Sequence, residues 1–156
     1  MRASPRTAGT RVNAWTTPHV LTISDAGDVN TLNPHLGHFA AVANLLEMTM
    51  AWLVKWDEHN EPYPELATEV PTRTNGGIST DGLTITYHIR TGVVWSDGAP
   101  FDADDVVFST SVVNDMANNE AGRFDQTECV DEPDKYTVVY HLKKPYSPSA
   151  VAFFSS

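Results

Sequence analysis

The stretch GLTITYHIRTGVVWSDGAPFDADDVVFS, residues 82–109, contains the strongest local structural signals in this chain. Asp81-Gly82, at its start, is a dipeptide typical of the tight turn that closes a hairpin. Over residues 83–90 apolar and polar side chains alternate, which is the period of a β-strand with one buried face. That face is expected to carry Leu83, Ile85, Tyr87 and Ile89.

The second half of the stretch predicts a turn followed by a helix. Asp97-Gly98 repeats the turn signal. Asp102 is expected to cap a helix, because its carboxylate can accept a hydrogen bond from the backbone amide of Asp105. Asp104 and Asp105 then fall in the first turn, where the helix dipole favours negative charge. Asp105, three residues after Asp102, also makes a short version of the capping box.

Working outward, the rest of the chain predicts elements of both kinds. Alternation over residues 19–25 and over residues 136–143 predicts two more strands. Apolar residues recur at helical spacing over residues 39–54, which predicts a helix with a core-facing side. The buried face of the last strand is expected to carry Tyr136, Val138, Tyr140 and Leu142.

The remaining segments are predicted to be turns and loops. A turn over residues 58–60 leads into an extended passage at Pro62 and Pro64, since proline fixes its own backbone and restricts its predecessor. Residues 114–134 are polar and are expected to form a long loop. Because strands and helices do not alternate regularly, we predict an α+β fold with a mixed, mainly antiparallel sheet and a few helices.

The charge of the chain argues against nucleic-acid binding. Lys and Arg number 10 and Asp and Glu number 20, which gives a net charge of −10 and a surface that repels phosphates. No apolar run approaches the roughly 20 residues of a membrane span. The first residues lack the apolar middle of a secretion signal, and residues 1–14 are expected to be a flexible tail.

Side chains that could carry chemistry form no complete constellation. His35 and His38, with His19 upstream, could share a metal ion, but no Cys or Glu completes the site. The acids at 102–105 lack the glycine and glutamate of a calcium loop. Cys129 is the lone cysteine, with no base placed near it, so we expect a structural role for it. We therefore expect no catalytic residue, no metal, no cofactor and no enzymatic activity.

Several blocks together resemble the family 5 solute-binding proteins, the dipeptide-, oligopeptide- and nickel-binding receptors of ABC importers. The block at 82–109 is similar to the family pattern G-L-T-(Y/W)-T-F-x-L-R-x-G-V-x-(F/W)-x-D-G-x-P-(F/L)-x-A-x-D-V-x-(F/Y)-S. Two positions depart from the family: Met50-Ala51-Trp52 replaces Y-E-G, and Val70 stands where Trp is frequent. The other matching blocks, in order, are TLNPH (31–35), MTMAWLVKWDEHNEPYPELATEV (48–70) and YTVVYHLKKP (136–145).

The resemblance implies the N-terminal part of a type II periplasmic-binding-protein-like fold. Residues 15–51 would belong to lobe I, and residues 52–156 to the small extra domain, incomplete at its C-terminus. The implied function is non-covalent binding of a peptide or related small solute, with an ABC permease in the membrane as partner. The implied location is periplasmic or extracellular and membrane-associated, although this chain, which we expect to be truncated, shows no signal peptide.

The resemblance also implies which residues bind the solute. In such receptors the loop after the N-P-H segment lines the cleft, and the long loop of the small domain reaches the ligand. His38 stands where some peptide receptors have an acid that attracts the peptide amino terminus; an imidazole lacks that negative charge, which disfavours a free-amine peptide. The implied ligand-binding residues are Leu36, Gly37, His38, Phe39, Val42, Arg123 and Phe124.

Other assignments remain open from sequence. Phe39 and Phe124 adjoin loops and could line a pocket, whereas Trp52 and Trp95 are expected in the core. A stand-alone interaction module derived from the small domain is the alternative function, because apolar residues near the end of the chain need cover. These are Val151, Phe153 and Phe154.

Overall fold

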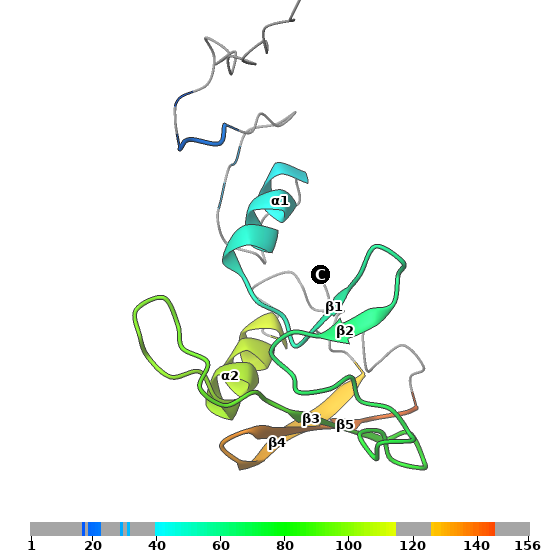
Figure 1. Ribbon diagram of the computed structural model, residues 1–156. Coiled ribbons are helices and arrows are strands. Elements are labelled where there is room, and N and C mark those ends of the chain that lie inside the picture. The colour runs from blue at the N-terminus through cyan, green and yellow to red at the C-terminus, as the bar shows by residue number, and fades with distance from the viewer. Residues whose placement is uncertain are drawn as a thin grey trace, which may run out of the picture.

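The computed structural model describes residues 17, 19–22, 29, 31, 40–114 and 126–145. Two helices and five strands lie within these residues (Figure 1). None of the described helices is long and apolar enough to cross a lipid bilayer. In chain order the elements are α1 (Ala40–Thr49), β1 (Val54–Trp56), β2 (Pro62–Pro64), β3 (Thr84–His88), α2 (Ala103–Asn114), β4 (Thr127–Asp134) and β5 (Thr137–Leu142).

Every strand pairing in the described residues is antiparallel, which confirms the predicted α+β fold. β3, β5 and β4 form a three-stranded sheet in that spatial order, with β5 in the centre. β1 and β2 form a separate two-stranded hairpin. Figure 1 shows α2 and this hairpin on the same side of the larger sheet, so one sheet face is covered and the other is not covered by any labelled element.

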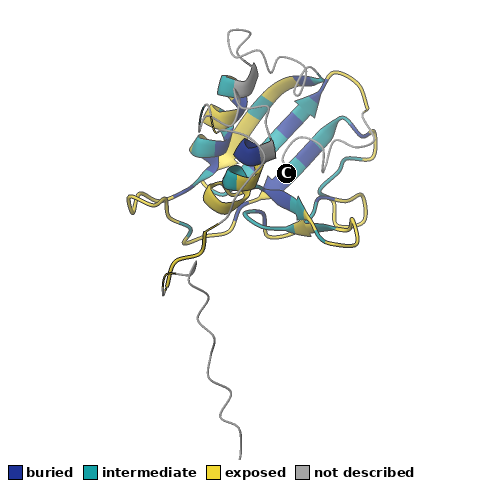
Figure 2. Cartoon of the chain, turned by 90° about the horizontal axis from the view of Figure 1, so that it is seen from above, coloured by how far each residue is buried: buried dark blue, intermediate teal, exposed yellow. Residues whose placement is uncertain are grey.

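The core lies between the covered face of the sheet, α2 and the hairpin. Ile85 and Tyr87 of β3 are fully buried, as are Val138 and Tyr140 of β5. The strand register sets Ile85 opposite Tyr140 and Tyr87 opposite Val138, so the four side chains pack as cross-strand pairs. Figure 2 shows buried positions alternating with less buried ones along these strands. The alternation confirms the faces predicted from sequence.

A polar contact joins this core to α2. The rings of Tyr87 and Tyr140 meet edge to face, with centroids 5.8 Å apart. The hydroxyl groups of Tyr140 and Thr110 lie 2.7 Å apart, and Thr110 Oγ1 donates to the carbonyl of Val106 at 2.9 Å. Tyr140 Oη is therefore the donor to Thr110 Oγ1, which leaves both buried hydroxyl groups satisfied. Burial raises the pKa of the Tyr87 and Tyr140 hydroxyl groups.

The predicted turns are confirmed by backbone geometry. Gly82 and Gly98 have φ of 71° and 89°, a left-handed conformation that favours glycine. The predicted turn at residues 58–60 closes the β1–β2 hairpin, where Asp57 Oδ1 accepts hydrogen bonds from the amides of His59 and Glu61, each at 2.8 Å. Pro62 and Pro64 bound β2, so the predicted extended passage is a strand.

The helix predicted over residues 39–54 is shorter in the structure. α1 ends at Thr49, whose hydroxyl donates to the carbonyl of Leu45 at 2.9 Å. Leu53 and Val54 are buried in the core instead, and Val54 begins β1. Their spacing fits a helix, but pairing with β2 overrides that local preference, as tertiary contacts often do.

Two other predictions were wrong. The loop predicted over residues 114–134 contains β4, whose mostly exposed sequence has no apolar alternation and which forms by pairing with β5. Residues 19–22, from the strand predicted over 19–25, form no strand, and His19 has φ of 64°, outside the extended region. Residues 23–25 lie outside the described part of the chain.

The start of α2 contains one half of the predicted capping box. The backbone amide of Asp102 donates to Asp105 Oδ2 at 3.1 Å, which is the contact from the third helical residue back to the cap. Trp95, predicted in the core, is 47% exposed; its Nε1 also donates to Asp105 Oδ2, at 3.2 Å, and its ring meets Phe101 edge on. Through these contacts Trp95 connects the turn at Gly98 to the first turn of α2.

The buried register of β5 yields a stability prediction. Val138→Ala should lower the free energy of unfolding by about 2 kcal/mol, because it removes fully buried methyl groups and leaves a cavity. Val94→Ala is the matched control, since Val94 is 60% exposed and the same change there should cost less than about 0.5 kcal/mol. Urea unfolding of both variants checks this; equal losses would refute the assigned core.

Candidate functional site

The structure describes one of the seven residues that the family resemblance implies as ligand contacts. Val42 lies on the first turn of α1 and is fully buried. The remaining six predicted contacts lie outside the described residues, as do the apolar residues at 151, 153 and 154 and the histidines at 35 and 38. The six predicted contacts outside the described part are Leu36, Gly37, His38, Phe39, Arg123 and Phe124.

The position of α1 is the part of the predicted site that the structure resolves best. α1 begins at Ala40, directly after the segment 36–39 that is predicted to line the cleft. Alanines in its sequence AAVANLLEMT favour helix at low entropic cost. At its end the amide of Met50 donates to the carbonyl of Leu46 at 2.8 Å, which completes the last turn before β1.

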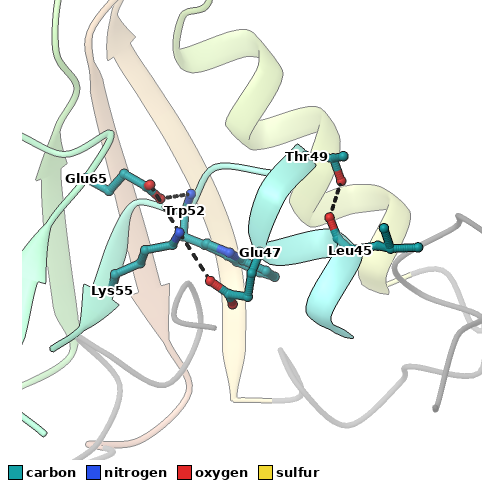
Figure 3. A network of polar contacts seen from close by, with 6 residues as sticks. All are labelled: Leu45, Glu47, Thr49, Trp52, Lys55 and Glu65. Carbon is teal, nitrogen blue, oxygen red and sulfur yellow. Dashed lines mark hydrogen bonds and ion pairs between the residues drawn. The ribbon is translucent and has the colours of Figure 1, made fainter. Parts of the chain in front are cut away.

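An ion-pair network joins the end of α1 to the β1–β2 hairpin (Figure 3). Lys55 Nζ lies 3.2 Å from Glu47 Oε2 on α1 and 3.3 Å from Glu65 Oε1, which follows β2. The other carboxylate oxygen of Glu65 accepts a hydrogen bond from the backbone amide of Trp52 at 2.6 Å. Lys55 therefore connects α1 to the hairpin, and Glu65 also connects the hairpin to the segment between α1 and β1.

The Lys55 side chain at the centre of this network is 13% exposed. Desolvation lowers the pKa of Lys55, but hydrogen bonds and charges from Glu47 and Glu65 outweigh it and hold that pKa above its ordinary value. Because the pKa of Lys55 is higher in the folded chain, its charge stabilises the fold fully at any pH below the ordinary lysine pKa. This contribution disappears as the pH rises through the raised pKa. The contribution of the Lys55 charge is therefore present at neutral pH and is lost as the solution becomes alkaline.

The indole of Trp52 lies beside the same network. Within the described residues its buried Nε1 has no hydrogen-bond partner. A buried donor without a partner costs about 1–3 kcal/mol. Trp52 is half-buried rather than fully in the core, so the prediction for its packing is met only in part.

A second group of polar residues surrounds a hollow of about 360 Å³ between the start of α2 and the β4–β5 turn. Lys135 Nζ lies 3.5 Å from Asp102 Oδ2 across it. A hydrogen bond with Asp104, then desolvation and the charges of Asp104 and Asp102, raise the pKa of Glu132. Sequence reasoning missed Glu132, because its segment was predicted to be a loop; pairing of β4 with β5 brings it to the helix start.

Cys129 lies in an unexpected place. It is exposed on β4 rather than packed in the core, so burial does not support the predicted structural role. Desolvation and the charges of Asp131 and Glu128 raise the pKa of its thiol. The thiolate is the nucleophilic form, so these neighbours make Cys129 a poor nucleophile at neutral pH. With Asp131 and His141 it forms a group of possible metal ligands on the uncovered sheet face.

Comparison with known proteins places this architecture among binding proteins. The family described as "Bacterial extracellular solute-binding proteins, family 5 Middle" matches residues 61–156. Protein XP55 of Streptomyces lividans is 34% identical over 129 residues, which cover 82% of this chain and 22% of that protein. The periplasmic alpha-galactoside-binding protein of Rhizobium meliloti is 34% identical over 92 residues, covering 55% of this chain and 12% of the relative.

Solved structures agree with the sequence match. The fold is similar to that of NikZ from Campylobacter jejuni in complex with Ni(L-His), with a TM-score of 0.69 and 28% identity over 81% of this chain and 24% of NikZ. Haemophilus influenzae OppA, in complex with the peptide RPPGFSPFR, gives a TM-score of 0.68 at 23% identity, over 80% of this chain and 28% of OppA, and supports the fold alone. The chain thus spans about a quarter or less of most of these proteins.

The Lys55 network predicts a specific loss on substitution. Lys55→Met keeps the apolar stem but removes the charge, leaving Glu47 and Glu65 unpaired. We expect the free energy of unfolding to fall by about 1–3 kcal/mol, as for a partly buried pair that loses one partner. Urea unfolding at neutral pH measures the loss, and hydrogen exchange should report faster exchange in α1.

Lys135→Met is the matched control. Lys135 also faces an acid, but its side chain is 54% exposed, and such a pair contributes about 0–1 kcal/mol. A loss from Lys135→Met equal to that from Lys55→Met would show that the network does not hold α1.

Proposed function

We propose, on the premise that this chain belongs to family 5 of the bacterial extracellular solute-binding proteins, that it contributes to a receptor that delivers a small solute to an ABC importer. The match of the family over residues 61–156 carries this proposal. Within such a receptor, residues 15–51 would be a segment of lobe I and residues 52–156 the small extra domain. Residues 1–14 would be a tail ahead of both.

The proposed ligand is a peptide or a related small solute. The proteins similar to this chain include an alpha-galactoside-binding protein, NikZ in complex with Ni(L-His) and OppA in complex with a nonapeptide, so one scaffold accommodates several ligand chemistries. Ligand identity therefore depends on the side chains of the site rather than on the fold. For this chain those would be the segment 36–39 with Val42, and Arg123 with Phe124.

The proposed mechanism is binding by closure of two lobes around the solute, without covalent chemistry. The ion pairs of Lys55 support the part of this mechanism that α1 would play. They hold the end of α1 against the hairpin, so the segment that precedes α1 would enter the cleft from a fixed direction. A permease on the membrane would then receive the solute from the periplasmic or extracellular side.

This proposal predicts weak and localised solute binding by the 156-residue chain. The chain spans 22% of XP55, so it can supply only part of an enclosing pocket. We expect a dissociation constant of about 1 mM or weaker, corresponding to roughly −4 kcal/mol. The measurement is an NMR titration of the ¹⁵N-labelled chain with dipeptides, tripeptides and their N-acetylated forms. Shifts should concentrate at residues 36–42 and 123–124.

Variants make the experiment specific. Phe39→Ala and Arg123→Ala should remove the shifts, whereas Phe108→Ala, which truncates an exposed aromatic residue on α2, should leave them unchanged. Stronger binding of the N-acetylated peptides would support the inference from His38 that a free amine is not preferred. Absence of saturable shifts for every solute, or shifts confined to other residues, would refute the assigned contacts; micromolar affinity would refute the need for a second lobe.

A further inference from the structure

Three side chains with different metal-ligating atoms converge on the uncovered face of the three-stranded sheet. Cys129 and Asp131 come from β4, and His141 comes from the central strand β5. One ligand atom from each of the three lies within 4.8 Å of the others. His141 Nε2 and Asp131 Oδ2 are already 2.9 Å apart. Cys129 and Asp131 are exposed and His141 is partly exposed, so solvent reaches the group.

A β-bulge brings Cys129 to this face. Thr127 pairs with Leu142, and both are buried on the core side. The next pair is Cys129 with His141, so Glu128 is an extra residue in β4. Because side chains alternate along a strand, a one-residue shift moves every later residue to the opposite face. Without the extra residue Cys129 would lie opposite Tyr140 in the core.

We propose that Cys129, Asp131 and His141 form a binding site for a zinc-type divalent transition-metal ion. Zinc is commonly bound by thiolate, imidazole and carboxylate, and a site with three protein ligands keeps a fourth position for water. Zn–N distances of about 2.0–2.1 Å and Zn–S distances of about 2.3 Å separate tetrahedral ligand atoms by roughly 3.3–3.6 Å. The present ligand atoms, which lie within 4.8 Å of one another, are close to that spacing.

The ligand atoms also decide which class of ion is bound. Calcium and magnesium require several oxygen ligands, which this group does not offer, whereas sulfur and nitrogen select zinc and its neighbours in the first transition series. Glu128 adds negative charge close to Cys129, and the whole chain carries −10, so a cation is attracted to this face. The side chains of Asp131 and His141 are 66% and 37% exposed, which leaves the ion a path to them.

The consequence of binding is a cross-link between strands. β4 lies at the edge of the sheet and has two register irregularities, whereas β5 lies in its centre. A bound ion would join the two strands at the residues that follow the first irregularity. Because the ion would bind the folded chain and not the unfolded chain, it would raise the thermal stability of the protein by mass action.

Cobalt and zinc titrations of the full chain test the proposal. With the chain kept reduced, Co²⁺ should bind at one equivalent and produce a thiolate-to-cobalt charge-transfer band, which excess Zn²⁺ removes. Cys129→Ser should abolish this band, and His141→Asn and Asp131→Asn should weaken binding about tenfold or more, since even indirect partners at metal sites cost that much. Zinc should raise the melting temperature of the native chain but not of Cys129→Ser.

His88→Asn is the matched control, because His88 is exposed on the neighbouring strand β3 and does not belong to the group. Its cobalt spectrum should equal that of the native chain. A charge-transfer band that persists in Cys129→Ser, an equal loss in His88→Asn, or no cobalt binding by the native chain would each overturn the proposal. None of these outcomes bears on solute binding, which is measured at other residues.

Discussion

The pairing of β5 with both of its neighbours is the constraint on which the other features depend. Val138 and Tyr140 on its inner face are fully buried and meet Tyr87 and Ile85 across the sheet. The same strand fixes β4 on its other side and, through the Tyr140 hydroxyl, contacts Thr110 of α2. A shift of β5 by one residue would exchange its buried and exposed faces. The register of β5 therefore determines the positions of the core, of the hollow between α2 and the β4–β5 turn, and of the residues on the uncovered sheet face.

Side-chain alternation and turn dipeptides in the sequence predicted those elements whose structure depends mainly on neighbouring residues. β3 and β5 alternate regularly, and Asp-Gly dipeptides mark two turns, so both strands and both turns were predicted correctly. β4 was missed because its sequence, TECVDEPD, carries no apolar alternation and acquires strand geometry only from its partner. The start of β1 was assigned to a helix because Leu53 and Val54 fit either element until the pairing with β2 is known.

The candidate sites show the same division. Resemblance predicts a solute-binding segment, of which Val42 is the residue that the structure describes. Composition drew attention to Cys129 as a lone thiol but placed no partner near it. Its neighbours Asp131 and His141 come together only through the irregular pairing of β4, and that pairing depends on contacts between distant parts of the chain. Glu132 reaches Asp104 for the same reason.

The composition of β4 has a further consequence for how copies of this protein meet one another. An edge strand offers backbone donors and acceptors that can extend a sheet into a neighbouring molecule, as happens in fibril growth. Here four of its eight residues are acidic, Pro133 lacks an amide hydrogen, and two irregularities bend its outline. Two such edges approaching each other would bring like charges together before backbone hydrogen bonds could form between them. This edge of the sheet therefore disfavours edge-to-edge pairing of two copies at high concentration.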